Sequence, residues 1–168
     1  MTPEQNEIYT TWVKLCTLLS EEGYTTDPRK MKEVMASFKT GCEPTKEKSG
    51  PDCYFVNEEG QTRPAERKST TAKNIKGSYT GQSKQKSWEE QVTYTQKKIK
   101  SMDRHYFDKF CSKSGHILES WFITGDVAYE IILPQLEKYF SGDGHRADQR
   151  PAATISKGHI MDHGEKVL

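Results

Sequence analysis

The sequence predicts an all-α fold: a helical bundle of four to five helices with a long basic loop and at most one small β-hairpin. Apolar side chains recur at helical spacing in several stretches, which capping residues precede and glycines follow. Only 33% of the 168 residues are hydrophobic, and the mean hydropathy is −0.89. Because this apolar content is low for a globular domain, we expect one small core accompanied by polar segments.

Residues 1–41 are predicted to form an N-terminal helical hairpin. Thr2, with Gln5 three residues later, is a typical helix start. The apolar face of this helix would consist of Ile8, Trp12, Leu15 and Leu19. A second helix begins at Asp27-Pro28 and ends at Gly41. The short connection between the two helices favours an antiparallel pair.

Residues 42–87 are predicted to be an irregular basic loop or linker. Prolines and glycines interrupt any helix, and only residues 53–56 are β-prone, so a short strand or hairpin is expected there. In residues 61–87, Ile75 and Tyr79 are the only large apolar side chains. This stretch cannot bury enough surface to offset the entropy lost on ordering.

Residues 88–140 are predicted to be C-terminal helices that pack with residues 1–41 as one domain. Ser87 and Glu90 form a capping box, and apolar side chains follow in steps of three or four residues as far as Phe110. Further helices cover residues 117–140, with a kink at Pro134, and residues 141–168 are expected to be a flexible tail. The predicted core consists of Trp12, Phe38, Trp88, Tyr106, Phe110, Trp121, Phe122 and Phe140.

The positive charge is concentrated in the middle of the chain. Residues 61–100 carry ten basic and three acidic side chains, whereas both flanking segments are net negative. A flexible cationic segment suits a polyanion, because neutralised phosphates release counterions on binding. The predicted nucleic-acid contacts are Arg63, Arg67, Lys68, Lys73, Lys76, Lys84, Lys86, Lys97, Lys98 and Lys100.

We therefore expect a non-enzymatic nucleic-acid-binding protein, with RNA favoured, that self-associates or joins other protein subunits in a larger assembly. Helical coat or nucleocapsid subunits and small subunits of ribonucleoprotein particles are built in this way, although no motif identifies either class. The alternative is a protein-interaction adaptor that docks through the helix beginning at residue 88 or through the tail.

No metal site or cofactor is predicted. Cys42, Cys53, Cys111 and His116 are ligand types for zinc, but their spacing matches no zinc motif, so free thiols are expected. His159 and His163 stand four residues apart, but glycines flank them and a helix there is doubtful.

A metal-dependent nuclease is a minor alternative. Carboxylates of Asp52, Glu58, Glu59 and Glu66, together with Lys68, are the residue types that hold Mg²⁺ and orient a water for phosphodiester hydrolysis. This chemistry needs the groups on adjacent strands, whereas the pattern predicts one short strand and a polar loop. His105 and Asp108 are interpreted as a surface pair on a helix.

Other classes are disfavoured by what the sequence lacks. No run of about 18 apolar residues predicts a membrane span, and the acidic, polar N-terminus is unlike a secretory leader. The chain has no glycine-rich phosphate loop and no serine-nucleophile motif. We expect an intracellular, cytoplasmic protein with no membrane partner.

Overall fold

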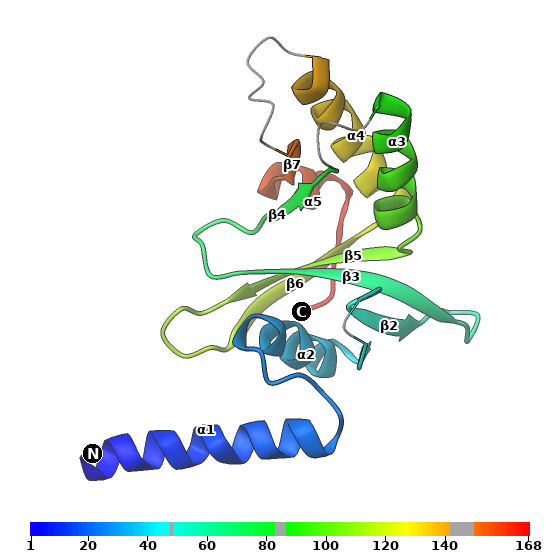
Figure 1. Ribbon diagram of the computed structural model, residues 1–168. Helices are drawn as coiled ribbons and strands as arrows, with labels where there is room; N and C mark the ends of the chain where they lie inside the picture. Colours follow the sequence, from blue (N-terminus) through cyan, green and yellow to red (C-terminus); the bar gives the residue numbers. More distant parts are fainter. Residues whose placement is uncertain (48, 83–86, 142–149) are drawn as a thin grey trace.

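A mixed β-sheet with helices on both sides is the centre of the molecule (Figure 1). The computed structural model describes residues 1–47, 49–82, 87–141 and 150–168. The helices are α1 (Pro3–Glu21), α2 (Pro28–Thr40), α3 (Trp88–Thr95), the π-helical segment η1 (Gln96–Lys100), α4 (Gly125–Ser141) and α5 (Lys157–His163). The strands are β1 (Glu43–Pro44), β2 (Cys53–Val56), β3 (Thr62–Thr70), β4 (Gly77–Thr80), β5 (Arg104–Phe110), β6 (Ile117–Thr124), β7 (Ala152–Ile155) and β8 (Glu165–Lys166).

The main sheet has six strands in the order β1-β2-β3-β5-β6-β8. All neighbours are antiparallel except β3 and β5, which run parallel. A parallel pair needs a long crossover, and here β4, α3 and η1 provide it. The second, two-stranded sheet pairs β4 with β7.

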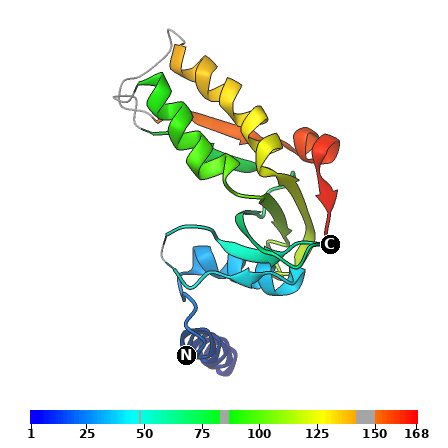
Figure 2. The same cartoon turned by 90° about the vertical axis from the view of Figure 1, so that its right-hand side faces the viewer.

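Two layers cover the main sheet. Helix α2 lies on one side, while α3, η1, α4 and the small sheet lie on the other (Figures 1 and 2). The larger core fills the space between the main sheet and this second layer, and includes Phe107, Ile123, Ile132 and Ile155. Helix α1 projects from the body next to α2, with Leu19 buried against Met31 and Val34.

The predicted all-α fold is wrong. Residues 104–124 form the antiparallel strands β5 and β6 in place of helices. The helical spacing of apolar residues does not exclude strands, because side chains four residues apart, such as Tyr106 and Phe110, share one face of a strand as well as one face of a helix. Strand β5 is buried on both faces, so it also lacks the alternation that identifies a half-exposed strand.

The predicted long basic loop is also wrong, because residues 62–70 form β3 in the middle of the main sheet. Arg67 is fully buried there, in an ion pair with Asp108 of β5. The strand tolerates this charge in the core because Asp108, 41 residues away in the sequence, neutralises it. Residues 77–80 form β4, and residues 152–166 of the expected tail form β7, α5 and β8.

Several local expectations are confirmed, whereas part of the predicted core is exposed. Helices α1 and α2 and the short strand at residues 53–56 are present, and Thr2–Gln5 and Ser87–Glu90 form capping boxes. Of the predicted core, Tyr106, Phe110 and Phe122 are buried, whereas Trp12 and Phe38 are 42% and 49% exposed. No helix within the described parts of the chain has the length and apolar character needed to cross a bilayer.

Candidate active site

Asp52, Glu66 and Lys68 meet where β2 begins beside β3. Strand β2 starts at Cys53 opposite Ala65, so residues 66–70 of β3 run past its end. There the carboxylate of Asp52 replaces a strand partner, because its Oδ2 accepts a hydrogen bond of 2.9 Å from the backbone N–H of Arg67. The Asp52 N–H also donates to the Ala65 carbonyl at 3.0 Å. These two bonds fix Asp52 against the strand that carries Glu66 and Lys68.

Glu66 and Lys68 form a half-buried ion pair on the face of β3 opposite to Arg67. The Lys68 ammonium donates to Oε1 of Glu66, and the side chains are 26% and 14% exposed respectively. Burial raises the pKa of the Glu66 carboxyl, Lys68 opposes this shift, and the negative charge of Asp52 adds to it. The site thus holds carboxylates that repel each other.

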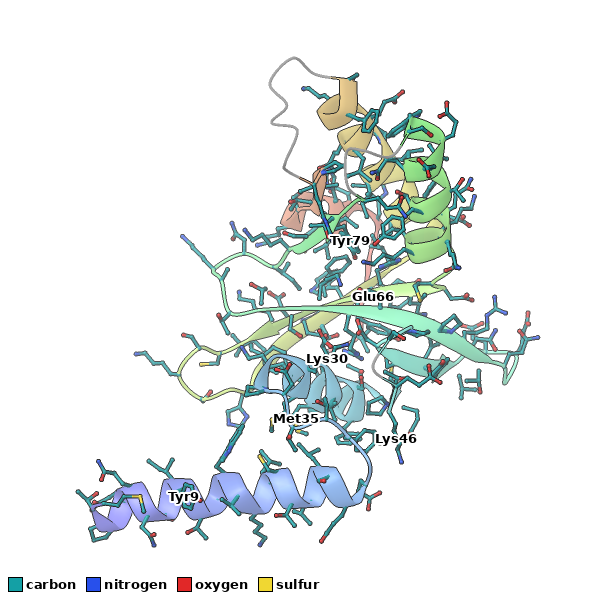
Figure 3. The ribbon with its side chains drawn as sticks, viewed as in Figure 1. Tyr9, Lys30, Met35, Lys46, Glu66 and Tyr79 are labelled. Atoms are coloured by element: carbon teal, nitrogen blue, oxygen red, sulfur yellow. The ribbon has the colours of Figure 1, made fainter. Side chains whose placement is uncertain are left out.

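Helix α2 contributes a second ion pair from the other side of Asp52. Lys30 Nζ lies 3.2 Å from Asp52 Oδ1 and 3.8 Å from Glu33 Oε2. Burial and the charge of Asp52 raise the pKa of Glu33 to about 7, against the opposing effects of Lys30 and Lys68. Figure 3 shows Lys30 of α2, Glu66 of β3 and Tyr79 of β4 in succession from one side of the sheet to the other.

A buried hydrogen-bond chain holds Lys68 from the opposite layer. The Lys68 ammonium lies 5.3 Å from the ring centroid of Tyr79, whose hydroxyl is 3.0 Å from Nδ1 of His105. His105 is neutral because burial lowers its pKa to about 4, and its Nε2 donates to the Ile99 carbonyl at 2.9 Å. Nδ1 therefore accepts the hydrogen bond from Tyr79, which fixes the ring that contacts the Lys68 ammonium.

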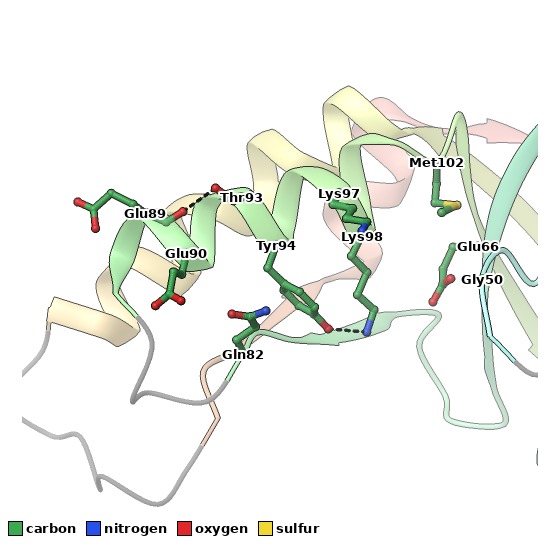
Figure 4. Close-up of a pocket in the computed structure, with 10 residues that line it drawn as sticks. All are labelled: Gly50, Glu66, Gln82, Glu89, Glu90, Thr93, Tyr94, Lys97, Lys98 and Met102. Carbon is green, nitrogen blue, oxygen red and sulfur yellow. Dashed lines mark hydrogen bonds between the residues drawn. The ribbon is translucent and has the colours of Figure 1, made fainter.

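A cleft of about 770 Å³ opens beside Glu66 (Figure 4). Helix α3 and η1 form one side of it, and Gln82, Gly50 and Glu66 lie across from them. The complete lining is Gly50, Glu66, Gln82, Glu89, Glu90, Thr93, Tyr94, Lys97, Lys98 and Met102. Lys98 donates to the hydroxyl of Tyr94 at 3.0 Å. Its positive charge, like that of Lys68, partly offsets the rise in the pKa of Glu66.

The structure brings three of the predicted nucleic-acid-binding cations to this region: Lys68 beside Glu66, and Lys97 and Lys98 along the cleft. The other cations that the structure describes do not line the cleft. Arg67 is buried, Arg63 pairs with Asp103 at 2.5 Å, and Lys100 pairs with Asp126 at 3.3 Å. Lys73 and Lys76 are exposed between β3 and β4, and Lys84 and Lys86 lie outside the described residues.

The contacts of Arg67 hold the core together. Its Nη1 donates to both carboxylate oxygens of Asp108, at 2.9 and 2.8 Å, and its guanidinium lies 4.4 Å from the Tyr106 ring centroid. Ser120 of β6 donates to Asp108 Oδ1 at 2.6 Å. The pair thus ties β3, β5 and β6 together, and any phosphate contact by Arg67 would require it to leave the core.

The residues considered for zinc do not converge. Cys42 and Cys53 are buried in one apolar cluster, whereas Cys111 is near His116 at the β5–β6 turn, and all four cysteines are free thiols. His159 and His163 lie on α5, with His159 bonded to Ser156. Within the described segments, no three His, Cys, Asp or Glu side chains are arranged to hold a metal by themselves.

Reasoning from the sequence groups Asp52, Glu66 and Lys68 only as a minor alternative. It does not identify Glu33, Gln82 or Tyr94. The Glu66-x-Lys68 spacing was the available signal, because alternate residues of a strand share a face. Glu33, Gln82 and Tyr94 join the site only through the packing of α2, β4 and α3. No known family model matches the chain, and no curated protein matches it in sequence, so the function rests on this geometry.

Proposed function

We propose that the protein is a divalent-cation-dependent hydrolase that cleaves phosphodiester bonds in nucleic acid. The observation that carries the proposal is the placement of Asp52, next to the start of β2, against the segment of β3 that carries the Glu66–Lys68 ion pair, with Glu66 lining the cleft that also carries Lys97 and Lys98. Such a site needs its groups on or next to adjacent strands: Glu66 and Lys68 lie on β3, and Asp52 directly precedes β2, which pairs with β3.

The two carboxylates suit Mg²⁺ or Mn²⁺. These are hard cations that bind oxygen, and one or two protein carboxylates suffice because water and substrate phosphate complete the coordination. Burial and, to a smaller extent, the negative charge of Asp52 raise the pKa of Glu66, and a cation held by the two carboxylates would offset the repulsion between them. Such a cation supplies polarisation of the phosphoryl oxygen and activation of a bound water.

The residues of the chain would divide the remaining work. Lys68 is held by Glu66 and by the ring of Tyr79, so its ammonium would be fixed where negative charge develops on the phosphoryl group. Lys97 and Lys98 would contact flanking phosphates. Hydrolysis departs from the sequence-based expectation of a non-enzymatic protein, because a site that only bound phosphate would not need buried carboxylates next to it.

The test is cleavage of single- and double-stranded DNA and RNA with Mg²⁺, with Mn²⁺ and with EDTA. We expect cation-dependent products from the wild type, and a loss of roughly 100-fold or more in D52N, E66Q and K68Q. The matched controls are K109Q and E119Q, which break a half-buried pair of 3.4 Å on β5 and β6 and should leave cleavage unchanged.

Absence of cation-dependent cleavage in the wild type on all four substrates would overturn the proposal. If the same protein nevertheless bound these nucleic acids, non-enzymatic nucleic-acid binding would be the better assignment. The exposed Lys73 and Lys76, together with Lys97 and Lys98, favour that second function.

A further inference from the structure

We infer that two copies of the chain associate through α1, with the N-terminal half of each helix lying antiparallel along the C-terminal half of the other. The inference concerns the helix that projects from the body, and it is independent of the proposed function (Figures 1 and 3). The contact face of α1 is an uncharged set of side chains in steps of three or four residues: Gln5, Tyr9, Trp12, Val13, Cys16 and Ser20.

The N-terminal half of α1 lies free of the rest of its own chain. Residues 1–14 are exposed throughout, whereas Leu19, near the other end of the helix, is buried against α2. Four of residues 3–14 are β-branched, which lowers their helix propensity. A free helical segment of about 12 residues is marginal in water, because most helical stability comes from packing of an apolar face. A second helix packed on this half would supply that stability.

The exposed apolar area is large enough for a weak dimer. Tyr9 is 58% exposed and Trp12 is 42% exposed, and Ile8 and Val13 beside them are exposed as well. Because a buried aromatic side chain covers roughly 150–250 Å², these two leave about 200 Å² open in each copy. Two helices about 28 Å long then give an interface at the low end of the size range, below about 1,200 Å² in total, which is typical of reversible association.

The contact face is complementary to itself only in the antiparallel direction. Its large side chains, Tyr9 and Trp12, lie in the N-terminal half, and the small side chains Cys16 and Ser20 lie in the C-terminal half. A groove of about 430 Å³ runs along the helix from Trp12 past Cys16 to Ser20. An antiparallel pair centred between Trp12 and Val13 places Tyr9 opposite Cys16 of the partner subunit, so each groove receives a large side chain. A parallel pair would oppose large to large and leave the grooves empty.

The charges of α1 also favour a second copy over other occupants. At about 100° per residue, Glu4, Glu7 and Lys14 fall on the side of the helix opposite to the contact face, and Glu21 reaches only the edge of the groove. Antiparallel packing opposes the helix dipoles and brings the N-terminus of one helix towards Glu21 of the other. With three acidic side chains and one basic side chain, α1 does not attract nucleic acid or an anionic membrane.

The first test is the oligomeric state of the full chain by sedimentation velocity, from about 5 µM to about 1 mM. We expect a monomer–dimer equilibrium with Kd on the order of 10–500 µM. Y9A and W12A should each weaken it roughly 10- to 100-fold, because a symmetric dimer contains every substitution twice. The matched controls are K14A, on the opposite side of the same helix, and V56A, an exposed apolar residue of β2; both should leave Kd unchanged.

The second test is disulfide crosslinking with diamide at about 1 mM, which reports the direction of the helices. It uses the C111S background, because Cys42 and Cys53 are buried. In an antiparallel pair, Y9C should give a linked dimer through Cys16 of the partner subunit. The background protein alone, and Y9C combined with C16S, should stay unlinked, whereas a parallel pair would link both of these controls.

A chain that stays monomeric up to about 1 mM contradicts the inference, as does a dimer that Y9A and W12A leave unchanged. Linked dimers in the two controls, or none from Y9C in a dimeric protein, exclude the antiparallel arrangement. A monomer that sediments with phosphatidylcholine vesicles, and loses this binding in W12A, would assign the contact face to a lipid surface instead. None of these results depends on whether the protein cleaves nucleic acid.

Discussion

Glu33 illustrates at the scale of one residue how the site is tuned. Burial and Asp52 raise its pKa to about 7, whereas Lys30 and Lys68 lower it and Glu66 raises it slightly further. A cation bound at Asp52 and Glu66, as proposed, would favour the ionised form of Glu33, so metal binding and proton release would be linked. The proton is mostly held one pH unit below the pKa and mostly lost one unit above it.

Metal affinity should therefore rise with pH. Between about pH 6 and about pH 8, the affinity for Mn²⁺ measured by calorimetry should increase by up to about tenfold for one linked proton. E33Q should flatten this dependence, whereas E47Q, which alters the same small cavity of α2, should retain it. A slope that persists in E33Q would contradict the role given to Glu33.

The raised pKa of Glu33 also affects the stability of the metal-free protein. Because the folded pKa of Glu33 exceeds the ordinary value of 4.5, the folded state holds its proton over a range where the unfolded state has released it. The contribution of Glu33 to the free energy of unfolding is therefore greatest below about pH 4.5 and is lost as the pH rises through about 7. Added cation should oppose that loss.

At the scale of secondary-structure elements, the Arg67–Asp108 pair fastens β3 to β5. Both side chains are fully buried, so removal of either partner leaves a charge in the core. We expect R67M and D108L each to lower the free energy of unfolding by about 3–5 kcal/mol, measured by urea denaturation. The double variant R67M/D108L should recover much of that loss, and a strictly additive loss would contradict the pairing.

This pair also explains why the sequence misrepresents β3. Local signals are reliable where the partners are close in the chain, as in the capping boxes at Thr2 and Ser87. The composition of residues 62–70 is typical of a solvated loop. No neighbouring residue indicates that Asp108 neutralises Arg67. The convergence of Asp52 with Glu66 depends on the same strand, so the carboxylate site could be considered from sequence but not selected.

At the scale of the whole molecule, α1 stands apart from the sheet and its layers (Figures 1 and 2). Several of its apolar side chains are exposed, Ile8 at 70% and Leu18 at 52%, whereas Leu19 is buried against α2. The helix thus adds little to the core that holds the site.

Deletion of residues 1–22 should leave the rest of the chain folded. Loss of the Leu19 contact costs about 1.5–3 kcal/mol, which lowers Tm by about 3–12 °C in calorimetry. The single variant L19A should reproduce most of this decrease, and cleavage should be retained in both. Absence of a cooperative unfolding transition in the shortened chain would show instead that α1 is integral to the body.

The two faces of β3 give the protein an unusual sensitivity to chain length. Odd-numbered residues carry the buried guanidinium, and even-numbered residues carry Glu66 and Lys68. If the turn at residues 57–61 gained one residue and β3 shifted to absorb it, the two sets would exchange sides. A lysine would then point at Asp108 and the arginine at the cleft, so the fold and the chemistry would be lost together in one event.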